Sequence, residues 1–298
     1  MKKIYTYLLV VITIGFSACE KDNVVLTTDR PGTPVIVVPL VTPISIPPAE
    51  DSTLLLGNPS DAKTDEAYFS NYLLSEGYYS VSYNRDRGTS NWVSWHLANT
   101  DIGSISRQSD FRSNNNLPFD WYHVDNSSYT GSGFDRGHMC PSADRTATDT
   151  ANSSTFLMTN IIPQAPYCNQ VTWAGLETYS RTLVQSGKEL YIISGSYGEG
   201  GTLGTSGTTT TINNGKVTVP AQLFKIIVVL PNGGDDLSRV TNTVRTIAVL
   251  MPNSDADNAD WKTYRTSIDN IENETGYDFL NKVSTSIQDV LEARVDNL

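Results

Sequence analysis

The sequence predicts an α+β fold with a mainly antiparallel central sheet flanked by helices. Segments of alternating apolar and polar residues come first, stronger apolar segments follow, and two helical patterns lie together at the C-terminal end. Strands and helices are therefore segregated rather than alternating, which favours the α+β class. A chain of 298 residues, 39% of them hydrophobic, is long enough for one large core.

Five segments have the pattern of strands. Residues 78–83 and 91–97 alternate apolar and polar side chains, and the polar turn 84–90 between them predicts an antiparallel hairpin. Trp92 and Trp95 are expected to pack in it, with His96 in a structural role. Three stronger apolar segments are predicted to be buried strands: 190–194, 223–230 and 246–251.

Four segments have helical spacing, namely 65–74, 172–184, 263–274 and 284–295. Asn169 is a good start for the second helix, and Gly276 ends the third. The last helix is expected to turn Ile287, Val290 and Leu291 inward. Between these elements, residues 101–133 and the Gly/Thr-rich residues 198–215 predict a long loop and a mobile hairpin loop.

The first 51 residues have the composition of an export signal and a linker. Two lysines precede the mostly apolar run 4–16, and Ser17 and Ala18 precede Cys19, which resembles a bacterial lipoprotein signal. We therefore expect a signal peptide over 1–18, a lipid anchor at Cys19, a proline-rich tether over 19–51 and a folded domain over 52–298. The alternative for the tether is a first strand near 35–38. The location expected is an exported outer-membrane lipoprotein, facing the periplasm or the cell surface.

The charge balance argues against a broad basic surface. The chain has 21 Lys and Arg against 32 Asp and Glu, a formal net charge of −11. Neutralising many phosphates needs clustered basic residues. The composition still allows an enzyme that touches a few phosphates with local arginines and a metal ion.

Two polar clusters have the composition of a catalytic site. Residues 133–139 place Asp135, Arg136 and His138 around a flexible glycine. The second cluster contains Asn169-Gln170 and, eight positions after Asn169, Glu177. In an ideal α-helix eight positions correspond to a rotation of about 80° beyond two turns, so Asn169 and Glu177 can border one face.

Together these clusters resemble the DNA/RNA non-specific endonucleases, which have the ββα-metal (His-Me finger) fold. The resemblance rests on three matches: the Asp-Arg-Gly-His motif that ends at His138, the pair Asn169-Gln170 beginning 31 positions later, and Leu176-Glu177. Residues 91–97, 220–225 and 275–279 match more weakly. The resemblance covers residues 52–298 and implies hydrolysis of phosphodiester bonds in DNA and RNA without sequence specificity.

The resemblance implies a role for each matched residue. His138 would be the general base that activates water. Asn169 would be the single direct protein ligand of Mg²⁺ or Mn²⁺, and Glu177 would act on that ion through water. The ion would stabilise the phosphate and the leaving 3′ oxygen. Arg136 and Arg107 would stabilise charge on the phosphate.

Further expectations concern the surroundings of these residues. Asp135 is expected to orient Arg136 or the backbone of the motif, and Asn160 to support the site or contact substrate. Cys140 and Cys168 lie beside the motifs, and a disulfide between them is one possibility. Many relatives dimerise, so a homodimer is also possible.

Two other functions fit the residues less well. A zinc hydrolase would use His123, His138 and Cys168, although no short ligand spacing supports it. A non-catalytic surface lipoprotein would use a nuclease scaffold as a binding module, although His138, Asn169, Glu177 and Arg136 are all intact. His123 is otherwise expected to be structural or solvated.

Overall fold

The computed structural model describes residues 27–28, 34–35, 52–204 and 207–298. The chain divides into two units at Pro47 and Pro48. In the first unit, β1 (Thr27–Thr28) pairs antiparallel with β2 (Pro34–Val35), within the expected tether. The expected signal peptide, Cys19 and most of the tether lie outside the described residues. No helix in the described part of the chain is long and apolar enough to cross a bilayer.

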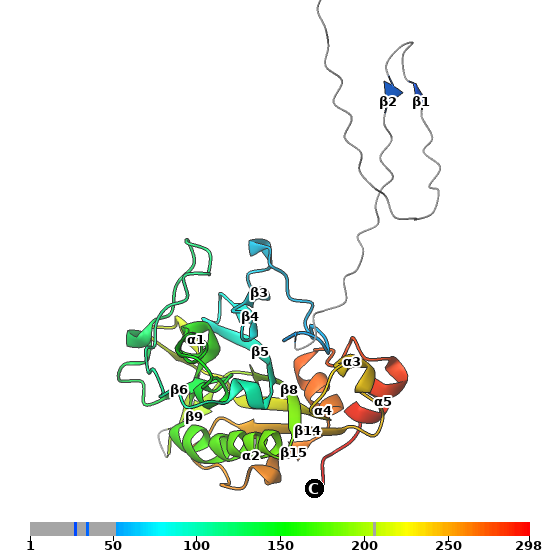
Figure 1. Cartoon of the computed structure of the whole chain (residues 1–298). Helices are drawn as coiled ribbons and strands as arrows, with labels where there is room; N and C mark the ends of the chain where they lie inside the picture. Colours follow the sequence, from blue (N-terminus) through cyan, green and yellow to red (C-terminus); the bar gives the residue numbers. More distant parts are fainter. Residues whose placement is uncertain (1–26, 29–33, 36–51, 205–206) are drawn as a thin grey trace, which may run out of the picture. The chain divides into compact units, whose positions relative to one another are not determined.

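The second unit is built around a seven-stranded sheet in which every neighbouring pair is antiparallel (Figure 1). The strand order is β15-β14-β13-β8-β5-β4-β3. With helices packed beside it, this sheet confirms the predicted α+β class. The strands are β3 (Tyr72–Ser75), β4 (Ser80–Asn84), β5 (Thr89–Leu97), β8 (Lys188–Tyr197), β13 (Gln222–Pro231), β14 (Arg245–Pro252) and β15 (Arg265–Thr266).

The two faces of this sheet support two separate cores. Successive side chains of a strand point to opposite faces. On β13 the even positions Phe224, Ile226 and Val228 join one core, whereas Leu223 and Ile227 join the other. Because both faces are covered, nearly all residues of β8 and β13 are buried, and β13 is apolar along most of its length instead of alternating.

The helices and short strands complete these layers. The α-helices are α1 (Asp149–Ser154), α2 (Ala174–Gln185), α3 (Asp236–Arg239), α4 (Ile268–Thr275) and α5 (Thr285–Glu292). A π-helix, η6 (Cys168–Trp173), leads into α2. The 3₁₀ turns are η1 (Glu66–Tyr68), η2 (Asn99–Asp101), η3 (Asn126–Tyr129), η4 (Ser142–Asp144), η5 (Met158–Asn160) and η7 (Trp261–Tyr264). The remaining pairs are β6 (Asp135–His138) with β7 (Ile161–Gln164), β9 (Gly201–Thr202) with β10 (Thr208–Thr209), and β11 (Thr211–Ile212) with β12 (Val217–Thr218).

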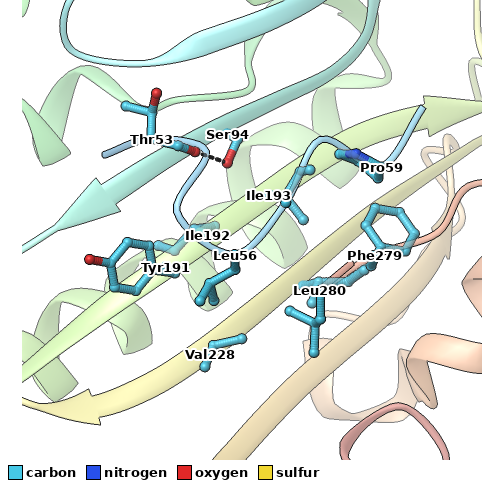
Figure 2. A pocket seen from close by; sticks show the side chains of 12 residues that line it. Thr53, Leu56, Pro59, Ser94, Tyr191, Ile192, Ile193, Val228, Phe279 and Leu280 are labelled. Carbon is cyan, nitrogen blue, oxygen red and sulfur yellow. Dashed lines mark hydrogen bonds between the residues drawn. The ribbon is translucent and has the colours of Figure 1, made fainter. Parts of the chain in front are cut away.

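Helices α4 and α5 belong to the core of Phe224 (Figure 1). Figure 2 shows this side close up, where Leu56, Val228, Phe279 and Leu280 line a small apolar cavity. The Ser94 hydroxyl donates to the carbonyl of Thr53 at 2.6 Å and holds the chain over it. The cavity has a volume of about 30 Å³, room for about one water. It is therefore a packing feature and no substrate site.

Three helix predictions were wrong in detail. Residues 65–74 form only η1 and then β3, because pairing with β4 buries Leu74 at the sheet edge. The third helix begins at Ile268, where Ser267 caps it, because the residues before it form η7 and β15. In α5, Leu291 is buried as expected, but Val290 is 40% exposed.

Candidate active site

The motif strand β6 and its partner β7 form the two-stranded part of the site. His138 lies opposite Ile161, and Gly137 lies opposite Ile162. A Cβ atom at Gly137 would lie 2.2 Å from Oε1 and 2.6 Å from Cβ of Gln164, so glycine is required by close packing. Only Ala165 separates β7 from the helical segment that starts at Pro166 and continues through η6 into α2, which completes a ββα unit.

The imidazole of His138 lies between two phenylalanine rings. Ring centroids are 5.5 Å apart for His138 and Phe111, and 4.9 Å apart for His138 and Phe156. Each phenylalanine ring also makes a cation–π contact with an arginine. The Arg136 guanidinium is 4.5 Å from the Phe111 centroid, and that of Arg107 is 4.8 Å from the Phe156 centroid. Both predicted arginines therefore gather around the predicted base.

These surroundings keep His138 neutral. Burial, together with the positive charges of Arg107 and Arg136, lowers the pKa of His138 to about 3. Its Nε2 atom is buried and has no hydrogen-bond partner among the described residues. An unpaired buried nitrogen is costly in a purely structural histidine. The neutral ring can accept a proton from a molecule that enters the site.

Asp135 is hydrogen-bonded to the side chains of Asn169 and Gln170, whereas it was expected to orient Arg136 or the backbone of the motif. Its Oδ2 accepts from Asn169 Nδ2 at 2.8 Å and from Gln170 Nε2 at 2.8 Å. Arg136 instead donates to Oδ1 of Asn126. Because the nitrogen of the Asn169 amide is bound to Asp135, its Oδ1 points elsewhere and has no hydrogen bond within the described residues.

Glu177 is paired with a lysine that the sequence analysis did not single out. Lys225 Nζ lies 3.7 Å from Glu177 Oε1, and it is 4.2 Å from the Trp173 ring centroid and 5.6 Å from that of Trp95. Burial raises the pKa of Glu177 to about 7, although Lys225 opposes this. Burial also lowers the pKa of Lys225, against the attraction of Glu177. A lysine within the apolar strand 223–230 was the available signal, because a fully buried charge requires a partner.

The helix that carries Asn169 and Glu177 differs from the predicted one. Pro166 and Tyr167 are already helical, and the Asn169 amide donates to the Ala165 carbonyl, so the predicted start at Asn169 was wrong. Pro166 suits a first helical position, where its missing N–H costs nothing. The following π-helical turn changes the rotation between Asn169 and Glu177 from that of an ideal α-helix. Such turns are frequent at functional sites.

Two asparagines hold the backbone around the motif. Asn160 is completely buried, accepts from the Cys140 amide at 2.9 Å, and donates to the carbonyls of Cys140 and Thr155. It therefore supports the chain after His138, one of its two expected roles. Asn253, which the sequence analysis missed, accepts from the Ala165 amide at 2.7 Å and donates to the Pro163 carbonyl at 2.9 Å.

The possible disulfide does not form. Cys140 and Cys168 are both free and buried. The two cysteines have different partners. The backbone N–H and carbonyl of Cys140 are hydrogen-bonded to the Asn160 side chain, whereas Cys168 Sγ accepts from Gln164 Nε2 at 3.6 Å. Burial raises the pKa of Cys140 to about 12, so this thiol stays protonated.

The zinc alternative also fails. Within the described residues His123, His138 and Cys168 do not form a group with metal-ligand spacing. The His123 ring is within 3.0 Å of the Pro118 carbonyl, consistent with a structural role. His96 lies on β5 next to Glu189, at 3.5 Å, and is buried, as a structural histidine would be.

Known proteins with similar sequences are nucleases. The sequence profile described as "DNA/RNA non-specific endonuclease" matches residues 56–286. A Nuclease of Nostoc sp. is 47% identical over 87% of this chain and 91% of its own length. Nuclease C1 of Cunninghamella echinulata is 30% identical over 80% of this chain and 91% of its own length.

Human mitochondrial Endonuclease G is 30% identical over 58% of this chain and 57% of its own length. A crystal structure of the EndoG/EndoGI complex contains a chain with a TM-score of 0.62 and 21% identity, covering 78% of this chain and 91% of that one. At that identity the likeness concerns the fold alone, and it agrees with the ββα unit described above. The chain belongs to the DNA/RNA non-specific endonuclease family and is an enzyme that hydrolyses nucleic acid.

Proposed function

We propose that the chain is a metal-dependent endonuclease in which His138 acts as general base and Asn169 holds one divalent metal ion. The observation that carries the proposal is the neutral, buried His138 with an unpartnered Nε2 beside two arginines. Arg107 is within electrostatic reach of both Glu177 and Arg136, which connects the motif strand with the helix of Asn169. These groups supply a base, phosphate donors and oxygen ligands in one place.

The residues present fit a hard divalent cation. Asn169 offers a neutral amide oxygen whose orientation Asp135 fixes, and Glu177 offers a carboxylate on the same helix. Few protein oxygens suit Mg²⁺, which keeps most of its waters, and Mn²⁺ accepts the same ligands. When bound, the ion would neutralise charge on the scissile phosphate and on the leaving 3′ oxygen.

The side chains around the phosphate divide the remaining work. Arg107 and Arg136 donate to phosphate oxygens and stabilise the charge that develops in the transition state. His138 takes the proton of the attacking water through a ring nitrogen. A phosphate bound to both arginines offsets their effect on His138, so substrate raises the pKa of the base above its value in the free enzyme.

The test is nicking of supercoiled plasmid by wild type and His138→Ala in Mg²⁺, with and without chelator. We expect His138→Ala to lose about 10²–10⁴-fold in rate, the usual contribution of a general base. The matched control is His123→Ala, on the long loop, which should stay close to wild type. Cutting by His138→Ala at the wild-type rate would remove the general-base assignment.

The graded variants come next in the same assay. Asn169→Ala should lose as much as His138→Ala, and Arg107→Ala and Glu177→Ala less. An enzyme restored by Zn²⁺ and not by Mg²⁺ after chelation would contradict the metal assignment.

We further propose that the enzyme is an exported outer-membrane lipoprotein carrying lipid on Cys19. The support is the order of a basic start, an apolar run and two small residues before Cys19. Labelled fatty acid should be incorporated into the wild-type chain and not into Cys19→Ser. Equal labelling of the two proteins would exclude this anchor.

A further inference from the structure

Helices α4 and α5 belong to the layer that packs against the core of Phe224 (Figure 1). Three carboxylates of these two helices lie together. Asp269 and Glu272 are on α4, and Glu292 is the last residue of α5. One carboxylate oxygen of each lies within 4.8 Å of the others. The family motifs contain none of the three residues.

Glu292 is the unusual member of this group. It is only 7% exposed, and its Oε1 is buried without a hydrogen bond to any described residue. It also lies at the C-terminal end of α5, whose last turn contains no basic residue. Burial and the negative end of the helix dipole both disfavour a carboxylate there.

In the described part of the chain, this charge is not compensated by an ion pair. Within residues 52–204 and 207–298 no Lys or Arg forms an ion pair with Asp269, Glu272 or Glu292. The charges that act on Glu292 are those of other carboxylates: Glu272, Asp269, Asp278 and Asp289.

A carboxylate four positions further on shows the contrast. Asp296 is bound by Arg245 Nε at 2.7 Å and by Arg265 Nη1 at 3.4 Å. Asp296 is thus paired with two arginines, whereas Glu292 has no such partner among the described residues.

We propose that Asp269, Glu272 and Glu292 bind one calcium ion that joins α4 to α5. Carboxylate oxygens are the ligands that Ca²⁺ prefers, at about 2.3–2.6 Å. Two oxygens on opposite sides of such an ion are about 4.6–5.2 Å apart, so oxygens within 4.8 Å of one another surround it with little movement. The ion would link the two helices at a position where the bare charges repel.

The rival explanation for the unpaired carboxylate is that Glu292 is protonated. Burial, followed by the neighbouring acids, raises the pKa of Glu292 to about 8, and burial also raises the pKa of Glu272. A protonated Glu292 would relieve the repulsion without any metal. The experiment must therefore separate calcium from protonation.

The test is thermal unfolding of the full chain in the Asn169→Ala background, which weakens metal binding at the active site. Adding 10 mM CaCl₂ at pH 8 to chelated protein should raise the Tm by about 5 °C, if the affinity is that of extracellular calcium modules. Adding Glu292→Gln should abolish this rise. The matched control is Glu274→Gln, an exposed acid on α4 outside the group of three, which should keep the rise.

The metal-free Tm distinguishes a lost ligand from a damaged fold. Glu292→Gln removes one of several repelling charges, so its Tm without calcium should equal or exceed that of the parent. The inference is overturned if calcium leaves the parent Tm unchanged while lowering the pH from 9 to 6 raises it. It is equally overturned if Glu292→Gln keeps the full calcium response.

Discussion

At the scale of single residues, the site depends on side chains that place other side chains. The Asp135 carboxylate is held by two side chains of η6, because Asn169 and Gln170 both donate a hydrogen bond to its Oδ2. Without this acceptor the Asn169 amide could rotate and present its nitrogen, which cannot bind a cation. Asp135 is therefore a positioning residue.

Asp135→Ala should raise the Mg²⁺ concentration needed for half-maximal nicking about 10–100-fold, the usual cost of losing a residue that orients a metal ligand. The maximal rate at saturating Mg²⁺ should fall much less. The measurement is the initial rate across a Mg²⁺ titration, with the exposed Asp120→Ala as control. An unchanged Mg²⁺ dependence would show that Asn169 needs no such support.

His138 also makes stability depend on pH. Its pKa is 6.5 in the unfolded chain and about 3 in the folded one. Between these values the unfolded chain holds a proton that the folded chain does not, so stability falls as the pH is lowered through this window.

His138→Gln should remove this contribution, which amounts to about 2.5 kcal/mol between pH 7 and 4.5. Urea unfolding at the two pH values measures it, and His123→Gln should keep the wild-type difference. Equal pH dependence in His138→Gln and wild type would mean that His138 is not held neutral by its surroundings.

At the scale of elements, the motif strand β6 packs tightly against its partner strand β7. Gly137 lies on β6 between Arg136 and His138, and Gln164 of β7 fills the space where its side chain would be. A residue with a Cβ atom at position 137 would therefore push β6 away from Gln164. The next residue, His138, lies between Phe111 and Phe156.

Gly137→Ala should destabilise the fold by about 1–3 kcal/mol, the usual cost of overpacking, and reduce nicking. Gly175→Ala is the matched control: its Cβ would lie 3.5 Å from Trp261, an ordinary contact, in the helix α2. Alanine there should be neutral or stabilising by up to about 1 kcal/mol. Denaturant unfolding of both variants checks the contrast, and similar losses in the two would contradict the packing argument.

At the scale of the whole molecule, an acidic enzyme acts on a polyanion. The net charge is −11. Lys225 faces Glu177, which leaves Arg107 and Arg136 as the predicted phosphate contacts. Affinity for DNA should therefore depend on very few phosphate contacts.

With two contacts, a log–log plot of KM against monovalent salt at fixed Mg²⁺ should have a slope of about 2, because each neutralised phosphate contributes about 0.9. Arg107→Gln should lower this slope by about 1. A slope near that of broad basic DNA-binding surfaces would mean that other basic residues contact the substrate.

Prediction succeeded where the signal is local. The strands predicted over 190–194, 223–230 and 246–251 were correct but shorter than the observed ones. An apolar run indicates the interior of a strand, whereas its ends carry no such signal. The 65–74 segment failed because pairing with β4 overrode its helical spacing. The site residues were predicted from motif spacing, whereas Lys225 and Asn253 were not singled out because each is far in sequence from the groups it contacts.

The sequence by itself determined the family and predicted the base and the metal-binding asparagine, because these depend on residue types at a set spacing. The tertiary structure decided how His138 is held neutral, since burial between Phe111 and Phe156 joins segments far apart in the chain. It also decided that Cys140 and Cys168 are free, because a disulfide depends on the distance between two thiols and not on their proximity to motifs. Local patterns identify chemistry, but only packing brings distant groups into contact.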